Sequence, residues 1–268
     1  ESPSKGARSP ILWNRAFKSL DLNAEMVPLD IAEENLSKVL SFLKNDKYFI
    51  GGAVAVPYKE KVFNWLKTNG SLSEEAKNIG AVNCLYRDKN NNLKGTNTDG
   101  EAGKSSLLRN YGSISNKNIL LIGYGGAGKA LLAFLEKEVL PNGKIYCLTR
   151  REDIKKKYTN VKFINSTQVN QHFHNFDILI NCTSVGFGDK INDSPIYIDK
   201  YNYNKNLFIF DIIYQPLETK LLKISKSLGL RTLNGLEMNL EQAVLAFGYA
   251  SKNDSQGFKD NVKIAMIK

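Results

Sequence analysis

The segment NILLIGYGGAGKALLAFLEKEV, from Asn118 to Val139, decides the fold of this chain. An apolar run typical of a buried strand leads directly into the pattern Gly-x-Gly-x-x-Gly, and helix-like apolar spacing follows. Glycines there let the backbone turn tightly and approach a pyrophosphate, whose charge lies at the N-terminus of the helix. An ordinary strand-to-helix turn is the alternative. The pattern predicts a dinucleotide-binding turn, formed by Gly123, Gly125, Gly126, Ala127 and Gly128.

The next apolar stretch, GKIYCLT, reads as a second strand that ends at Thr149, with Arg150 and Arg151 directly after it. A site for NAD usually has an acidic residue at this strand end, which binds the ribose 2′-hydroxyl. Two arginines would instead attract a 2′-phosphate, so we predict NADP as the cofactor. A solvated basic turn is the alternative, above all for Arg151.

Two later apolar runs, DILINCTSVGF and LFIFDIIYQP, read as further buried strands that end in polar residues. The first run ends in Asn181, Thr183 and Ser184, and the second ends in Asp211 and Tyr214. Open parallel sheets bind ligands at the carboxyl ends of their strands, so polar residues at successive strand ends predict a site. We assign Thr183 and Ser184 to the cofactor.

The rest of the chain alternates helix-like and strand-like patterns, which predicts an α/β fold with two domains. The hairpin pattern AVNCLYR–DKNNN–LKGTNTD precedes a connecting helix, and we place the domain boundary near Ala102. Pro57 suits the start of a helix, because its missing N–H would be unpaired there anyway. The other expected elements are helices over 9–22, 32–46, 58–68 and 235–251, a short strand over 24–31 and a buried strand over 49–56.

Composition excludes several classes of protein. The net charge is +10, but the lysines are dispersed and form no dense basic run, which argues against nucleic-acid binding. The longest apolar runs have the length of a strand, so no membrane span is expected, and the first ten residues show no secretory signal. The three cysteines, Cys84, Cys147 and Cys182, are expected to be reduced and buried in a cytoplasmic protein without a metal site.

Lys59 and Asp99 both follow strand-like segments of the first domain. A lysine beside a carboxylate is a plausible proton-transfer pair, because each holds the other charged and aimed. From spacing alone, a surface salt bridge is the simpler interpretation.

Seven motifs occur in the order and at the spacing typical of shikimate dehydrogenases, and the chain resembles that family over nearly its whole length. They are AVAVPYK, GAVNCL, GTNTDG, GYGGAGKA, INCTSVG, DIIYQPLET and GLEMNLEQA. The resemblance implies a substrate-binding catalytic domain over 1–102, joined by a C-terminal helix over 237–268, and a doubly wound Rossmann domain for NADP over 103–236. It implies reversible hydride transfer between the nicotinamide and a ring carbonyl. We expect the chain to be a monomer or homodimer.

The resemblance also implies roles for single residues. Lys59 and Asp99 would be the catalytic pair, with Lys59 handling the proton at the reacting oxygen. Asn83 and Gln242 would hold ring hydroxyls. The remaining implied ligands are Ser9 and Tyr214 for the substrate and Met238 beside the nicotinamide, although a core methionine is an equal alternative for Met238. His172 and His174 have no role in the family and are expected at the surface.

The chain departs from the family at the carboxylate side of the substrate. Ala7, Ala53 and Ala55 stand where the family has polar ligands, and Trp13 replaces a motif histidine. Arg8 is a candidate replacement ligand, because a guanidinium binds a carboxylate bidentately. The family's first strand would lie before Glu1. Three functions follow as predictions: oxidation of shikimate to 3-dehydroshikimate, a paralogue's action on quinate, amino-shikimate or a less polar ring alcohol, or nucleotide binding without catalysis.

Overall fold

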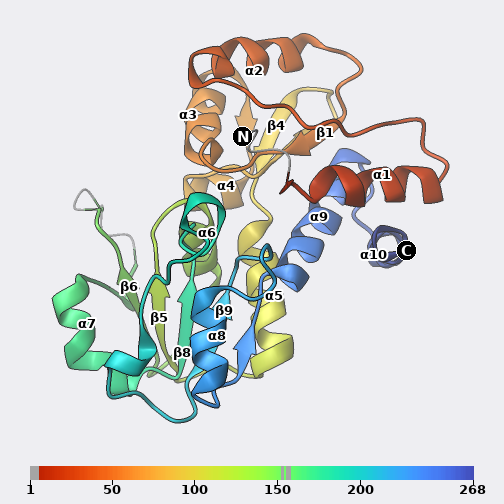
Figure 1. The fold of residues 1–268 in the computed structure, drawn as a ribbon. Helices are drawn as coiled ribbons and strands as arrows, with labels where there is room; N and C mark the ends of the chain where they lie inside the picture. Colours follow the sequence, from red (N-terminus) through yellow and green to blue (C-terminus); the bar gives the residue numbers. More distant parts are fainter. Residues whose placement is uncertain (1–5, 152–153, 155–157) are drawn as a thin grey trace. The chain divides into compact units, whose positions relative to one another are not determined.

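The computed structural model describes residues 6–151, 154 and 158–268 and divides into two compact units. Unit one contains Glu1–Asp99 and Leu240–Lys268, and unit two contains Gly100–Asn239. The chain therefore leaves unit one once and returns to it with its last residues (Figure 1).

Unit one is built on a four-stranded sheet of order β1-β3-β4-β2. β3 pairs antiparallel with β1 and β4, and β4 pairs parallel with β2. The antiparallel pair β3–β4 confirms the predicted hairpin. The strands are β1 (Gly51–Ala53), β2 (Ser71–Leu72), β3 (Cys84–Arg87) and β4 (Leu93–Thr96).

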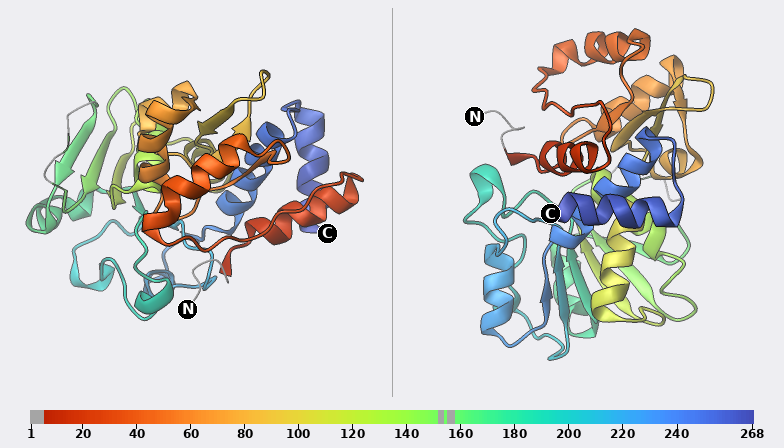
Figure 2. Two further views of the ribbon diagram at one scale, coloured as in Figure 1. Left: turned by 90° about the horizontal axis from the view of Figure 1, so that it is seen from above. Right: turned by 90° about the vertical axis from the view of Figure 1, so that its right-hand side faces the viewer.

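Helices cover both faces of this sheet. Side chains of successive strand residues point to opposite faces, and apolar ones on both faces of β3 are buried under helices. Cys84 and Tyr86 of β3 join a core formed with α1, α9 and α10, whereas Leu85 joins a core formed with α2, α3 and α4. Figure 2 shows α1 and α10 side by side. The helices are α1 (Ser9–Ser19), α2 (Leu36–Asn45), α3 (Lys59–Asn69), α4 (Glu74–Ile79), α10 (Gln256–Ile267) and α9 (Leu236–Ala250), whose residues before Leu240 belong to unit two.

Three expectations for unit one are wrong. Residues 24–31 form no strand; the side chain of Asn14 holds Met26 by two hydrogen bonds of 3.0 and 2.7 Å. The strand expected over 49–56 has only three residues, and Val56 beyond it is 68% exposed. Pro57 has no N–H and cannot continue a ladder. The C-terminal segment forms two helices, α9 and α10, with Lys252 between them at a φ of 57°.

Unit two is a six-stranded parallel sheet of order β10-β9-β8-β5-β6-β7. Read from β7, this is the doubly wound order that reverses direction between β5 and β8, where such sheets bind dinucleotides. The predicted fold class is confirmed. The strands are β5 (Asn118–Ile122), β6 (Lys144–Leu148), β7 (Val161–Ile164), β8 (Ile178–Asn181), β9 (Phe208–Asp211) and β10 (Thr232–Leu233).

Unit two has one helix before its first strand, α5, and further helices that follow its strands. The sequence predicted the connecting helix and the helix after the glycine-rich turn, and both are present. They are α5 (Asp99–Tyr111), whose first residue belongs to unit one, and α6 (Gly126–Leu135); α7 (Ser166–His172) and α8 (Lys220–Ser227) were not predicted.

Smaller predictions have mixed outcomes. The three cysteines are free and buried, as predicted. His174 is exposed, but His172 is half-buried, with its ring 5.2 Å from that of Tyr146. Within the described ranges, no helix is long and apolar enough to cross a bilayer.

Candidate active site

Lys59 is the first residue of α3 and lies where the chain turns away from the sheet of unit one. Its carbonyl accepts a hydrogen bond from the Val82 amide at 2.9 Å, and the neighbouring Tyr58 hydroxyl donates to the Ile31 carbonyl at 2.5 Å. These bonds tie the start of the helix to two other segments. The Lys59 side chain is consequently held at the sheet and is 15% exposed.

Asp99 is the first residue of α5, and the segment before it is fixed by its own side chains. Thr96 shares a 2.8 Å hydrogen bond with the Ser73 hydroxyl. Asn97 donates to the Ala81 carbonyl at 3.1 Å and accepts from the Asp99 amide at 3.0 Å. The motif GTNTDG thus forms a rigid strand-to-helix turn that positions the Asp99 carboxylate.

The Asp99 carboxylate has a separate partner on each oxygen. The Lys59 ammonium donates to Oδ2 at 2.5 Å, and the Asn83 amide donates to Oδ1 at 2.8 Å. The Lys59 and Asp99 side chains are 15% and 7% exposed. A solvated surface salt bridge, the simpler interpretation from spacing, is therefore wrong; the pair is largely buried and oriented by a third residue.

Thr98 and Gln242 complete this cluster in unit one. Thr98 donates from its amide to Asn83 Oδ1 at 2.8 Å and from its hydroxyl to the Gln242 carbonyl at 3.1 Å. The Gln242 side-chain oxygen lies 3.4 Å from Asn83 Nδ2. The structure thus brings together Lys59, Asp99, Asn83 and Gln242. Sequence reasoning missed Thr98, although it lies inside a quoted motif.

The positions that depart from the family pattern differ in their surroundings. Ala53 and Ala55 are exposed, so neither methyl group fills a core position. Trp13 is buried, with its ring 5.3 Å from that of Phe247, and has become a core residue. Ala7, Arg8 and Ser9 are half-buried where α1 begins.

The glycine-rich turn of unit two has the shape of a phosphate cradle. Gly123 has a φ of +98°, and an added Cβ at Gly128 would lie 2.1 Å from the Gly123 carbonyl oxygen, so packing explains both glycines. A Cβ at Gly125 would meet nothing within 4 Å. Packing does not require glycine at position 125, whereas close approach of a pyrophosphate would. The α6 N-terminus directly after Gly125 offers the amide groups that bind a pyrophosphate.

The other predicted cofactor residues lie at strand ends of the same unit. Thr149 follows β6 and accepts a 3.1 Å hydrogen bond from the Arg151 amide, and the side chains of Arg150 and Arg151 are exposed. Thr183 is half-buried and Ser184 exposed after β8. Tyr214 is half-buried after β9, and Met238 is 5% exposed in the first turn of α9.

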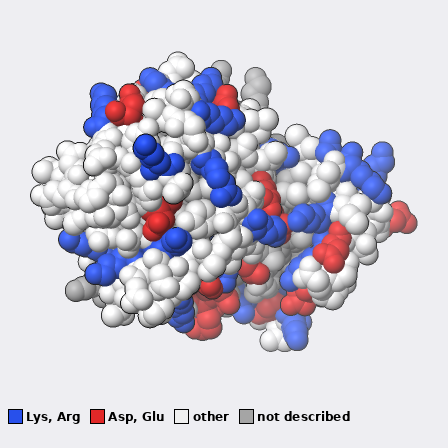
Figure 3. Space-filling model, turned by 90° about the horizontal axis from the view of Figure 1, so that it is seen from below, with Lys and Arg blue, Asp and Glu red and all other residues white. Residues whose placement is uncertain are grey.

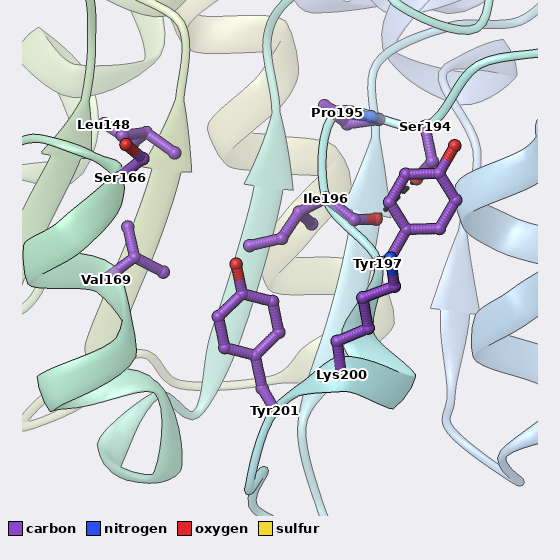
Figure 4. Close-up of a pocket in the computed structure, with 9 residues that line it drawn as sticks. All are labelled: Leu148, Ser166, Val169, Ser194, Pro195, Ile196, Tyr197, Lys200 and Tyr201. Carbon is purple, nitrogen blue, oxygen red and sulfur yellow. Dashed lines mark hydrogen bonds between the residues drawn. The ribbon is translucent and has the colours of Figure 1, made fainter.

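A cavity of about 200 Å³ lies between α7 and the segment 194–201, beside the end of β6 (Figure 4). It contains none of the predicted site residues. The Lys200 ammonium lies 5.0 Å from the centroid of the Tyr197 ring. The lining residues are Leu148, Ser166, Val169, Ser194, Pro195, Ile196, Tyr197, Lys200 and Tyr201.

Charge and metal-binding groups add no second candidate site. On the face drawn in Figure 3, lysine and arginine side chains are dispersed, with aspartate and glutamate among them. Within the part of the chain that the structure describes, no three His, Cys, Asp or Glu side chains are placed to hold a metal ion.

Comparison with known proteins gives a consistent result. The family model described as the shikimate dehydrogenase substrate binding domain matches residues 2–85. The chain is 34% identical to the shikimate dehydrogenase (NADP(+)) of Methanococcus vannielii over 253 residues, which cover 91% of this chain and 87% of that protein. It is 36% identical to the protein of the same name from Carboxydothermus hydrogenoformans over 254 residues, with the same coverage.

Solved structures agree with these relatives. A shikimate dehydrogenase crystallised with NADP+ is similar with a TM-score of 0.81 and 30% identity, covering 99% of this chain and 92% of that chain. The shikimate dehydrogenase of Aquifex aeolicus gives 0.82 and 29% identity, covering 99% and 95%. The predicted resemblance is confirmed.

Proposed function

The chain belongs to the shikimate dehydrogenase family, and on that basis we propose that it catalyses the NADP-dependent, reversible oxidation of shikimate to 3-dehydroshikimate. The observation that carries this proposal is the buried Lys59–Asp99 ion pair, oriented by Asn83. A chain that only bound a nucleotide would not need this pair in the unit that lacks the glycine-rich turn.

Lys59 is suited to move the proton at the reacting oxygen. An ammonium has three N–H bonds, and among the described residues Asp99 is the hydrogen-bond partner of the Lys59 ammonium. The other two N–H bonds can point to the ring oxygen. During oxidation the neutral amine form of Lys59 takes up the proton that leaves the ring hydroxyl and becomes the ammonium, and during reduction the ammonium returns that proton. Asp99 keeps the amine aimed, and the Asn83 and Gln242 amides bind neighbouring ring hydroxyls.

Unit two has the features that NADP requires. The pyrophosphate would lie at Gly125 and the α6 N-terminus, with the 2′-phosphate at Thr149, Arg150 and Arg151. Thr183, Ser184 and Met238 would border the nicotinamide side. When bound, NADP supplies the hydride acceptor. This assignment gives unit one, including Ser9, to the substrate and unit two to the cofactor. Tyr214 of unit two is proposed as a further substrate contact.

The proposed setting is the supply of aromatic amino-acid precursors in the cytoplasm. Three free, buried cysteines suit a reducing compartment. The partner is a small cyclic acid, and the active species is a monomer or homodimer.

A second candidate function rests on Ala53 and Ala55. Both are exposed and neither can donate a hydrogen bond, which favours a substrate without a tightly held carboxylate. Losing one hydrogen bond to a charged group costs about 1.5–3 kcal/mol, so two such losses would weaken shikimate binding strongly unless Arg8 replaces them. Quinate, amino-shikimate or a less polar ring alcohol would then be the substrate.

The deciding experiment measures NADPH formation with shikimate, quinate and amino-shikimate for the wild type and for Lys59→Met. We expect shikimate turnover in the wild type, and a loss of about 10²–10⁴-fold in kcat with NADP affinity within twofold in Lys59→Met. Lys77→Met is the matched control, because Lys77 pairs with Glu74 in the same unit but is 53% exposed. Turnover of another ring alcohol alone would establish the second candidate, and full activity of Lys59→Met would refute the role of Lys59.

A further inference from the structure

Asp211, the last residue of β9, is a buried carboxylate with three hydrogen-bond donors around it. The Thr219 hydroxyl donates to Oδ2 at 2.6 Å. The Asn181 amide and the Ile213 backbone amide donate to Oδ1 at 3.0 and 3.1 Å. The side chain has no exposed surface, so these groups replace water as its solvation.

One of these bonds leads into the loop after β8. Asn181 is the register partner of Asp211 on the neighbouring strand, and it too is fully buried. Its other side-chain atom, Oδ1, accepts from the amide and the hydroxyl of Thr183 at 3.0 and 2.7 Å. The Thr183 hydroxyl in turn accepts from the Val185 amide at 3.1 Å. Asp211 therefore fixes the Asn181 amide group, and that group fixes the loop 182–186.

The other two bonds hold the loop after β9. Ile213 directly precedes Tyr214, and Thr219 caps α8 by accepting from the Leu222 amide at 3.4 Å. The two loops also touch, because a Cβ added at Gly186 would lie 3.2 Å from Ile213 Cδ1 and 3.3 Å from the Thr219 side chain. One carboxylate is thus bonded, directly or through Asn181, to both ends of the 212–218 loop and to the loop beside it.

Among the described residues no cation is bonded to the Asp211 carboxylate, so this buried place is unfavourable for its charged form. Desolvation raises the pKa of Asp211 to about 6, and the bonds from Thr219, Ile213 and Asn181 offset only part of that effect. Capping α8 does not require the carboxylate, since the Thr219 hydroxyl performs it. A role beyond stability explains why a charged group occupies this position.

We propose that Asp211 is a positioning residue that holds two loops in the geometry for binding: 182–186, which carries Thr183, and 212–218, which carries Tyr214. This inference rests on the proposed function, which assigns Thr183 to the cofactor and Tyr214 to the substrate. Asp211 itself touches neither molecule in this account and acts through Asn181, Ile213 and Thr219.

The test compares Asp211→Ala and Thr219→Val with two controls. Thr219→Ser keeps the hydroxyl. Ser225→Ala removes a different buried hydrogen bond, from the Ser225 hydroxyl to the Leu221 carbonyl at 2.7 Å, within the same helix α8. The readouts are NADP affinity by calorimetry, KM and kcat with NADP and shikimate, and amide hydrogen exchange along unit two.

We expect Asp211→Ala to weaken NADP binding and to raise the KM for shikimate by about tenfold each, with amide exchange accelerated in both loops. Thr219→Val should show the same pattern more weakly and keeps the test available if Asp211→Ala does not fold. Thr219→Ser and Ser225→Ala should leave both constants within twofold, even where Ser225→Ala lowers the melting temperature.

Several results would overturn the inference. One is a folded Asp211→Ala variant with wild-type KM, NADP affinity and loop exchange. Another is a Ser225→Ala variant that loses as much NADP and shikimate affinity as Asp211→Ala does. If the wild type oxidises no ring alcohol in the panel, the proposed function fails. NADP affinity and exchange in the two loops then decide the positioning role by themselves, because neither readout needs turnover.

Discussion

In the wild type, the titration of Asp211 should lower the free energy of unfolding as the pH rises, and replacing Asp211 by Asn should remove that fall. Burial raises the pKa of Asp211 from 3.8 to about 6, so the folded chain holds the proton more tightly than the unfolded chain. The resulting stabilisation is fully present below the pKa of the unfolded chain and is lost as the pH rises through about 6. Asn181, Thr219 and the Ile213 amide, which face the carboxylate, are uncharged.

α8, which packs against β9, carries charged side chains, as does the residue before its cap. Lys223 and Lys226 are exposed and Lys220 is half-buried, and Glu218 pairs with Lys226 at 2.6 Å. None of them is hydrogen-bonded to the Asp211 carboxylate, and desolvation is the largest cause of its shift.

The magnitude follows from the two pKa values. With about 6 in the folded chain and 3.8 in the unfolded chain, linkage gives about 1 kcal/mol at pH 5, about 2 kcal/mol at pH 4 and roughly zero at pH 8. The asparagine variant does not titrate at this position. The difference in unfolding free energy, wild type minus Asp211→Asn, should therefore fall by about 1 kcal/mol between pH 5 and pH 8.

Urea unfolding at constant ionic strength measures this difference. The signal should be far-ultraviolet circular dichroism, because both tryptophans, Trp13 and Trp65, belong to unit one. Glu218→Gln is the control: Lys226 lowers the pKa of Glu218, so this variant should show no fall with rising pH. A wild-type-minus-Asp211→Asn difference that stayed flat, or rose with pH, would refute the argument that desolvation dominates at Asp211.

Three further predictions concern the two sites. Gly125→Ala should change the free energy of unfolding by no more than about 0.5 kcal/mol, because the added Cβ meets nothing, yet it should weaken NADP binding measured by calorimetry. Gly257→Ala, whose added Cβ also meets nothing, is the control. Equal NADP affinity in the two variants would contradict pyrophosphate binding at Gly125. The double variant Arg150→Ala/Arg151→Ala should weaken NADP binding about 10–100-fold and NAD binding hardly at all, since charge-assisted hydrogen bonds are worth about 1.5–3 kcal/mol. Equal effects on the two affinities would contradict a 2′-phosphate site at these arginines. Asn83→Ala should lower the unfolding free energy by about 1–3 kcal/mol, because it leaves the buried Thr98 amide unpaired. The same variant should also lower kcat. A wild-type kcat would show that Asp99 needs no orientation by Asn83.

Much of unit two could be predicted because its signals are local. The run before Gly123 has the length of the strand Asn118–Ile122, and the three glycines of the motif lie within six residues of one another. The positive φ of Gly123 and the close packing of Gly128 against the Gly123 carbonyl both arise within this short segment. A parallel sheet buried on both faces also gives continuous apolar runs, which are easily recognised.

Unit one was harder to predict because a strand needs a partner and a pattern does not name one. Residues 24–31 have strand-like apolar residues, but Val27 and Leu29 are 58% and 59% exposed and pair with no strand among the described residues. The Lys59–Asp99 pair, 40 residues apart, was favoured by resemblance rather than by spacing. Its burial depends on β4 and α3 meeting, which no short stretch of sequence encodes.

Asp211 illustrates the limit most clearly, because its position was visible and its role was not. The sequence places it at a strand end, where an outward carboxylate would be an ordinary ligand candidate. Its direction depends on the register of two parallel strands, in which Asn181 and Asp211 are paired. That register points the two side chains at each other, away from solvent, and the Asp211 carboxylate also accepts from Thr219. A strand-end residue can therefore serve a site by facing inward and holding the loops that face the ligand, and only the pairing of the strands distinguishes the two cases.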